Sequence, residues 1–179
     1  MTNRRELIAA LGAAPLGAQE AKKGEKLAPY YPTPELVVEK MLQFAVVKKG
    51  ETVFDLGSGD GRIVIMAAQK FGANAVGVEF DKDLAVQSSE RIKRMNLASK
   101  AKIIHGDMLQ QDYSSADVIT VYLLPVANEK LRPLLEKQLK KGARIVAHDF
   151  EVGGWKYDKQ EIIEDDGEGR SHTIFLYKR

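Results

Sequence analysis

The sequence of 179 residues contains no cysteine, a single tryptophan and no apolar run as long as a membrane span. The absence of cysteine excludes disulfides, thiolate metal sites and thiol catalysis. The three histidines, His105, His148 and His172, lie far apart and lack the spacing of metal ligands, so the sequence predicts no metal site. Basic and acidic residues nearly balance, 27 against 25. This balance gives no broad basic surface, and no nucleic-acid partner is expected.

The composition is that of one globular domain, with 44% hydrophobic and 29% charged residues. This domain is expected at residues 29–179. Residues 1–28 differ from it, because a basic pair, Arg4-Arg5, precedes a short apolar stretch and a small-residue end, Leu16-Gly17-Ala18. This segment is either a leader that would direct export or the frayed N-terminal helix of a cytoplasmic protein.

The stretch around which the chain is organised runs from Thr52 to Arg62 and reads T-V-F-D-L-G-S-G-D-G-R. A short buried strand leads into glycines at alternate positions, Gly57, Gly59 and Gly61, and an apolar helical segment follows. A strand that turns through glycines into a helix brings backbone N–H groups to one point, where they can bind a polar or anionic group. The dinucleotide fingerprint G-x-G-x-x-G fails at its third glycine, which argues against an NAD or nucleotide-sugar enzyme. A glycine-rich turn without a ligand is the alternative.

Strands and helices alternate in the order expected of an α/β protein with a mainly parallel sheet. The expected helices cover residues 34–45, 63–68, 81–96 and 128–139, with Pro133 inside the last. The expected strands cover residues 52–55, 74–80, 102–105, 117–124 and 143–150, and a terminal hairpin joins 160–164 to 173–177. Five parallel βα units followed by an antiparallel hairpin predict a Rossmann-like sheet of seven strands.

An acidic residue ends the second expected strand. Glu79 lies 22 residues after Gly57, and in a doubly wound fold an acidic residue near this spacing accepts hydrogen bonds from ribose hydroxyls. A solvated glutamate at the end of a strand is the alternative interpretation, and the position of Glu79 disfavours it.

Aromatic and polar residues flank the expected ligand site. Prolines keep the segment P-Y-Y-P-T-P extended, and Thr33 is expected to cap the helix that follows. Tyr30 and Tyr31 either line a pocket over the ligand or pack as ordinary aromatic residues. His148 and Asp149 end the fifth strand on the ligand side of the sheet, where they either contact a substrate or cap the strand.

Taken in order, D-L-G-S-G-D-G-R, G-V-E-F-D, H-G-D-M, Y-L-L-P and A-H-D-F resemble the motifs of the class I S-adenosylmethionine (SAM) dependent methyltransferases. The resemblance covers residues 29–179. It extends to small bacterial relatives of the mitochondrial lysine methyltransferases that modify the c subunit of ATP synthase and the adenine nucleotide translocase, although Y-L-L-P departs from these enzymes. It implies SAM as the cofactor and the class I methyltransferase fold. Because SAM is made in the cytosol, a cytoplasmic location is expected.

The resemblance also implies roles for individual residues. The methionine part of SAM would lie against the glycine turn and Asp55, the ribose against Glu79, and the adenine against Asp107 and Met108. The full set of expected SAM-binding residues is Asp55, Gly57, Ser58, Gly59, Gly61, Glu79, Phe80, Asp107 and Met108.

The acceptor is expected at the end of the fourth strand, which faces the reactive methyl group in this family. Enzymes that methylate nucleobase or glutamine amines carry D/N-P-P-Y/F there, whereas this chain has Y-L-L-P, so the resemblance argues against those acceptors. A protein lysine amine is the expected acceptor, and the candidate catalytic residues that would orient it are Tyr31, Tyr122, His148 and Asp149. No general base is assigned. A small-molecule methyltransferase and a SAM-binding module without catalysis are the alternatives.

Overall fold

Seven strands form one mixed sheet in the order β3-β2-β1-β4-β5-β7-β6 in the computed structural model, which describes residues 30–179. The strands are β1 (Thr52–Leu56), β2 (Asn74–Glu79), β3 (Ala101–His105), β4 (Val118–Val121), β5 (Arg144–His148), β6 (Lys159–Ile163) and β7 (His172–Lys178). The first five are parallel, and β7 runs antiparallel to β5 and β6. The predicted seven-stranded class I methyltransferase sheet is therefore confirmed. Residues 1–28, expected to be either a leader or a frayed N-terminal segment, lie outside the described residues.

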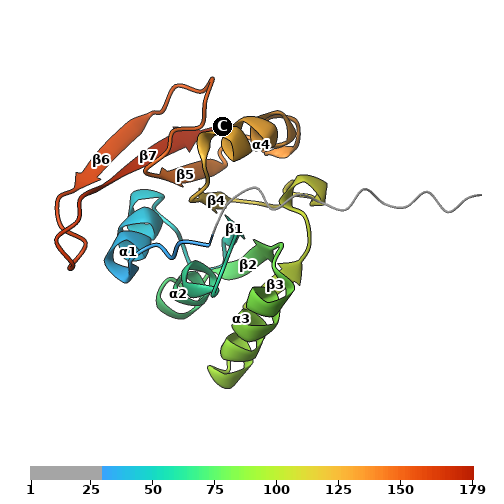
Figure 1. Cartoon of the computed structure of the whole chain (residues 1–179). Helices are drawn as coiled ribbons and strands as arrows, with labels where there is room; N and C mark the ends of the chain where they lie inside the picture. Colours follow the sequence, from blue (N-terminus) through green and yellow to red (C-terminus); the bar gives the residue numbers. More distant parts are fainter. Residues whose placement is uncertain (1–29) are drawn as a thin grey trace, which may run out of the picture.

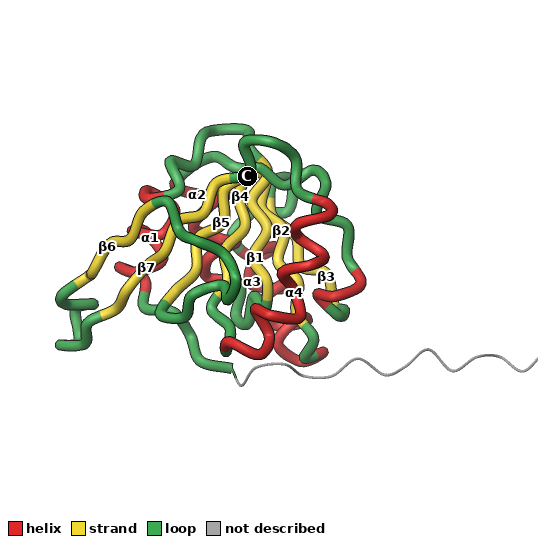
Figure 2. The backbone as a smooth tube through the Cα atoms, turned by 90° about the horizontal axis from the view of Figure 1, so that it is seen from above, coloured by secondary structure: helices red, strands yellow, loops and turns green. Residues whose placement is uncertain are grey.

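Helices cover both faces of this sheet (Figures 1 and 2). They are α1 (Glu35–Phe44), α2 (Arg62–Lys70), α3 (Lys82–Arg94) and α4 (Pro125–Gln138), with a 3-10 turn, η1, at Met108–Gln110. The helices α1, α2 and α3 lie on one face and α4 lies on the other. Within residues 30–179, no helix is both long and apolar enough to cross a bilayer.

Two hydrophobic cores result, one on each face of the sheet. Successive side chains of a strand point to opposite faces, so Val53 and Val118 pack under α1 and α2 while Phe54 and Ile119 pack under α4. The parallel strands β1, β2, β4 and β5 are buried on both sides, which explains why they appear in the sequence as nearly continuous apolar runs.

The fourth strand is shorter than predicted, and the helix after it begins earlier. The strand β4 ends at Val121, where its pairing with Leu56 of β1 also ends, because β1 turns away into the glycines. The next residues leave the sheet, and α4 begins at Pro125 rather than at residue 128. Proline suits this first helical position because its fixed φ matches the helix and its missing N–H would be unpaired there. Pro133 lies inside α4.

The prediction that Thr33 caps the first helix is wrong. Pro34 occupies the N-cap position of α1, and no side chain caps the helix there. The Thr33 hydroxyl instead lies 3.2 Å from Nδ1 of His148, at the end of β5. The segment before α1 is thereby attached to the end of β5.

Two isoleucines on strands offer a test of this core. Ile119 on β4 is fully buried, whereas Ile162 on β6 is 54% exposed. Ile119→Val should lower the free energy of unfolding by about 0.5–1.5 kcal/mol, because a buried methyl group is lost and a small cavity remains. The matched change Ile162→Val should stay within about 0.5 kcal/mol of the wild type. Urea unfolding would measure both, and equal losses would contradict the assignment of β4 to the centre of the sheet.

Candidate active site

The glycine turn is fixed to the end of β2 by the carbonyl of Val78, which accepts from the N–H groups of Gly57 and Ser58 at 2.9 and 3.0 Å, and by one carboxylate. The N–H of Gly59 donates to Oε2 of Glu79 at 2.6 Å, and the N–H of Asp81 donates to Oε1 of Glu79 at 2.8 Å. Gly59 has φ +51°, and a Cβ there would lie 2.5 Å from the ring of Tyr30, so both the turn and the close approach of the ring require glycine. Glu79 is buried and lies at the wall of a cavity.

Two of the predicted SAM-binding residues pack the turn against its neighbours. The side chain of Ser58 lies on β2 at Gly77, where a Cβ would be 2.5 Å from the serine Oγ. Gly61 is the N-cap of α2, and a Cβ there would lie 3.1 Å from Ser88 of α3. Gly61 therefore allows α2 and α3 to approach each other, and it does not line the cavity.

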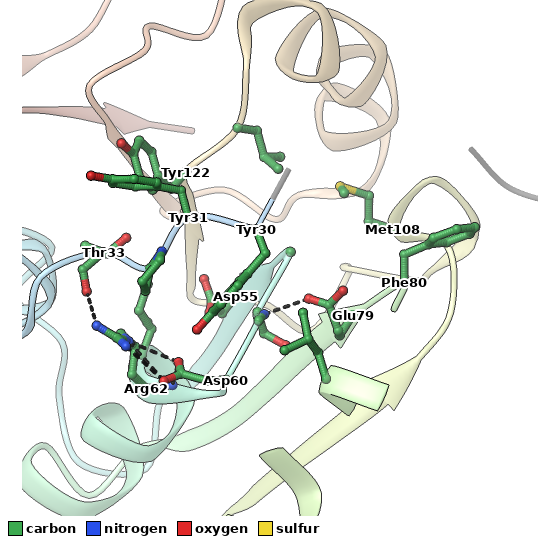
Figure 3. A pocket seen from close by; sticks show the side chains of 17 residues that line it. Tyr30, Tyr31, Thr33, Asp55, Asp60, Arg62, Glu79, Phe80, Met108 and Tyr122 are labelled. Atoms are coloured by element: carbon green, nitrogen blue, oxygen red, sulfur yellow. Dashed lines mark hydrogen bonds and ion pairs between the residues drawn. The ribbon is translucent and has the colours of Figure 1, made fainter. Parts of the chain in front are cut away.

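The cavity lies at the carboxyl ends of β1, β2 and β4, where ligands bind in open α/β sheets (Figure 3). It encloses about 720 Å³, part of which is open to solvent. Phe80 and Met108 lie at one end, Tyr31 and Tyr122 at the other, and Asp55, Tyr30 and Glu79 between them. The lining residues are Tyr30, Tyr31, Pro32, Thr33, Asp55, Gly57, Ser58, Gly59, Asp60, Arg62, Ile63, Glu79, Phe80, Leu84, Met108, Tyr122 and Leu123.

A buried acid, Asp55, forms the floor of this cavity. Its Oδ1 accepts a hydrogen bond of 2.8 Å from the hydroxyl of Thr120 on the neighbouring strand β4. Burial raises the pKa of Asp55 to about 7, the hydroxyl of Thr120 opposes the rise, and the negative charges of Glu79 and Asp60 add to it. A carboxyl group with this pKa becomes fully ionised when a positive group binds beside it.

An ion pair that was not among the predicted site residues joins the glycine turn to the segment before α1. Arg62 contacts Asp60 through its Nε and Nη2 atoms at 3.0 and 2.9 Å, and its Nη1 donates to the carbonyl of Thr33 at 2.9 Å. Arg91 of α3 reaches the same aspartate at 3.2 Å. The closely spaced Asp60 and Arg62 within the motif were a signal for the ion pair, but nothing in the sequence indicated the carbonyl of Thr33.

The other end of the cavity is aromatic. The rings of Tyr31 and Tyr122 meet edge to face with centroids 6.4 Å apart. Arg170, in the turn between β6 and β7, donates from Nη1 to the Tyr31 hydroxyl at 3.0 Å. The Tyr122 hydroxyl lies 3.4 Å from Oδ2 of Asp149, and burial followed by the charge of Asp149 raises the pKa of Tyr122 to about 12. Tyr122 therefore stays a neutral phenol at physiological pH.

Behind Tyr122 lies a cluster of histidines and acids that the cavity does not reach. The ring of His148 is fully buried and tilted against Tyr122, with centroids 3.9 Å apart. Its Nε2 lies 2.9 Å from Nδ1 of His172, and Oδ2 of Asp149 is 3.0 Å from the same nitrogen. Burial lowers the pKa of His148 to about 4, so its imidazole is neutral. His172 was missed as a site residue because it lies 24 positions beyond His148, on the antiparallel strand β7.

Most of the predicted site residues come together, and four lie outside the cavity lining. Those that line it are Tyr31, Asp55, Gly57, Ser58, Gly59, Glu79, Phe80, Met108 and Tyr122, and those that do not are Gly61, Asp107, His148 and Asp149. The carboxylate of Asp107 instead caps η1, where its Oδ1 accepts from the N–H of Leu109 at 2.8 Å. The contact of Asp107 with adenine stays a prediction. His148 contacts two residues of the cavity lining, Tyr122 and Thr33, and Asp149 contacts the lining at Tyr122.

The sheet order and this cavity define a class I SAM-dependent methyltransferase. Residues 55–159 match the model of the ANTKMT methyltransferase domain, and the chain belongs to this family. It is 43% identical to a protein-lysine N-methyltransferase of Saccharolobus islandicus, over 83% of this chain and 92% of the relative. It is also 32% identical to the ATP synthase c-subunit lysine N-methyltransferase of Homo sapiens, over 73% of this chain. The match covers only 55% of that human relative.

A solved structure agrees with this assignment. The RNA methyltransferase from Salinibacter ruber, crystallised with S-adenosyl-L-homocysteine, is 41% identical and superimposes with a TM-score of 0.76 over 83% of this chain and 93% of that one. This chain is accordingly a methyltransferase that uses SAM. The glycine cradle, which side chains would fill, and the carboxylate of Glu79 at the cavity wall suit that cofactor.

The raised pKa of Asp55 predicts a pH-dependent effect of Asp55→Asn. Between about pH 4 and pH 7 the unfolded chain has lost this proton and the folded protein keeps it, so ionisation of Asp55 lowers the free energy of unfolding as the pH rises. Asparagine does not ionise, so the free energy of unfolding of Asp55→Asn lacks this fall with rising pH. The stability of Asp55→Asn relative to the wild type should therefore rise from pH 5 to pH 8, by at most about 1.4 kcal/mol in the free energy of unfolding per pH unit. The difference in melting temperature between the two proteins should change in the same direction.

Scanning calorimetry at several pH values would measure this difference. The exposed Asp83 provides the matched control, because Asp83→Asn should give a difference that changes little over the same range. A pH-independent difference for Asp55→Asn would contradict the assignment of a raised pKa to Asp55.

Proposed function

We propose that the methyl acceptor is the side-chain amine of a lysine in a protein. The observation that carries this proposal is the 43% identity to a protein-lysine N-methyltransferase over nearly the whole of that relative. The human relative, which is named for lysine methylation of the ATP synthase c-subunit, supports the same class of acceptor. We place the reaction in the cytoplasm, where SAM is made.

The aromatic end of the cavity suits an amine. Methyl transfer from a sulfonium is an in-line displacement, and holding the reacting atoms in line supplies much of the rate. A lysine with its ordinary pKa near 10.4 must lose a proton before it attacks. An apolar environment between Tyr31 and Tyr122 would lower that pKa, since burial disfavours the charged ammonium. The neutral Tyr122 would orient the amine, and Asp149 and His148 would position Tyr122.

The rest of the cavity would bind SAM. The backbone of the glycine turn and Asp55 would seat the methionine part, whose positive ammonium favours an ionised Asp55. Glu79 has lone pairs left after accepting from the N–H groups of Gly59 and Asp81, and these would accept from the ribose hydroxyls. Phe80 and Met108 offer apolar contact for the adenine. When bound, SAM supplies the methyl group and the sulfur leaving group.

Glu79→Gln tests the cofactor half of this proposal. The change removes the negative charge while the size stays the same, so the affinity for S-adenosylhomocysteine should fall about 10- to 100-fold, as expected for the loss of hydrogen bonds to a charged group. Isothermal calorimetry would measure the affinity. Glu90→Gln on the outer face of α3 is the control and should bind like the wild type. Equal affinity of Glu79→Gln and the control would contradict the role of Glu79.

Transfer of labelled methyl from SAM into a cell extract tests the acceptor. The wild type should label a protein band that survives nuclease treatment, and mass spectrometry of that band should find methylated lysine. The Glu79→Gln variant should lose most of this label, which would show that the labelling depends on the SAM cavity.

Other outcomes would contradict the lysine proposal. Label that nuclease removes would assign an RNA acceptor, the class named for the Salinibacter ruber protein. Label confined to small molecules would assign a small-molecule methyltransferase. If S-adenosylhomocysteine binds and no fraction is labelled, a binding module without catalysis is favoured.

A further inference from the structure

We propose that His148, Asp149 and His172 form a binding site for one divalent transition-metal ion behind the aromatic end of the cavity. Each residue offers one ligand atom, these atoms lie within 4.8 Å of one another, and the three residues form a candidate metal group within residues 30–179. The atoms are Nε2 of His148, Oδ2 of Asp149 and Nδ1 of His172.

The distances within this triangle fit an ion. Nε2 of His148 lies 2.9 Å from Nδ1 of His172 and 3.3 Å from Oδ2 of Asp149, and the last two atoms are 3.0 Å apart. An ion at about 2.0–2.2 Å from each atom, with angles between ligands of roughly 90–110°, separates the ligand atoms by roughly 2.9–3.5 Å. The three separations are therefore already those of atoms that share one ion.

The outer nitrogen of each histidine already has a partner of the kind that metal ligands use. Nε2 of His172 lies 3.2 Å from the carboxylate of Asp166, and Nδ1 of His148 lies 3.2 Å from the hydroxyl of Thr33. Such outer partners fix the tautomer and orientation of metal-binding histidines. Asp166 is itself held by the guanidinium of Arg170 at 2.9 Å, so its carboxylate is available as an acceptor for an N–H at Nε2 of His172.

Nδ1 of His172 lies between the two other candidate ligand atoms. It is 3.0 Å from the carboxylate oxygen of Asp149 and 2.9 Å from Nε2 of His148. A cluster held by hydrogen bonds without an ion is the competing explanation, and the experiment distinguishes the two.

The backbone also directs the carboxylate of Asp149 to this point. Asp149 has φ +57°, a left-handed conformation that is uncommon for residues other than glycine, and strained backbone often marks functional sites. Its Oδ1 accepts from the N–H of Thr173 at 3.0 Å, which turns Oδ2 toward the two histidines. Two imidazoles and one carboxylate favour ions such as Zn²⁺, Co²⁺ or Fe²⁺ over Mg²⁺ and Ca²⁺.

Titration of the full chain with Co²⁺ tests this site, with a purification tag that contains no histidine. The sequence has three histidines and no cysteine, so the absorption of imidazole-bound Co²⁺ has few possible origins. We expect one ion per chain, displaced by Zn²⁺, and a higher melting temperature with Zn²⁺ than with EDTA. Exposed His105 provides the control, and His105→Asn should bind Co²⁺ like the wild type.

Three variants separate the inner from the outer contacts. His172→Gln keeps an amide donor near Asp166, and His148→Asn keeps a polar amide near Thr33. Each variant removes one of the three proposed metal ligands, so both should lose the Co²⁺ spectrum. Both should still bind S-adenosylhomocysteine. Asp166→Asn should weaken Co²⁺ binding by roughly 10- to 100-fold. Absence of Co²⁺ and Zn²⁺ binding by the wild type, which leaves only a hydrogen-bonded cluster, would overturn the proposal. Co²⁺ binding by His172→Gln at the wild-type affinity would also overturn the proposal.

Discussion

The hydrogen bond from the Gly59 N–H to the carboxylate of Glu79 is the contact on which the SAM site depends. It joins the turn after β1 to the end of β2, so that the backbone, a carboxylate and the start of α2 meet at one edge of the sheet. A side chain at position 59 would collide with Tyr30, and a side chain at position 77 of β2 would collide with Ser58 of the turn. Tyr30 and β2 therefore both pack closely against the turn, and the cavity lies beside it.

The acceptor end is built from parts of the chain that are distant in sequence. Tyr31 comes from the segment before α1, Tyr122 from the end of β4, and Arg170 from the terminal hairpin. The hairpin reaches back toward α1 in the fold, which is how Arg170 meets Tyr31 (Figure 1). The cluster around His148 supports Tyr122 from behind. The cofactor half thus depends on local sequence and the acceptor half on long-range packing.

This contrast explains how far the sequence alone could predict the site. The glycines and Glu79 belong to one βα unit and its neighbour, so short motifs could predict that they lie together, and the structure brings them together at the cavity. The end of β4 was misplaced because an apolar run does not show where its partner β1 turns away. Thr33 was assigned to a helix cap from its local pattern, although its hydroxyl contacts a histidine 115 positions away. The meeting of His148 with His172 follows from the antiparallel pairing of β7 with β5, which spacing cannot show.

The measurement that tests the central claim most directly is an NMR titration of the isotopically labelled chain with S-adenosylhomocysteine. If the glycine turn cradles the cofactor, the amide signals of Gly57 and Gly59 should shift most, together with those following Glu79, and Gly167 in the terminal hairpin should stay unchanged. Saturable shifts centred on any other surface, with the amides of the glycine turn unmoved, would contradict the account.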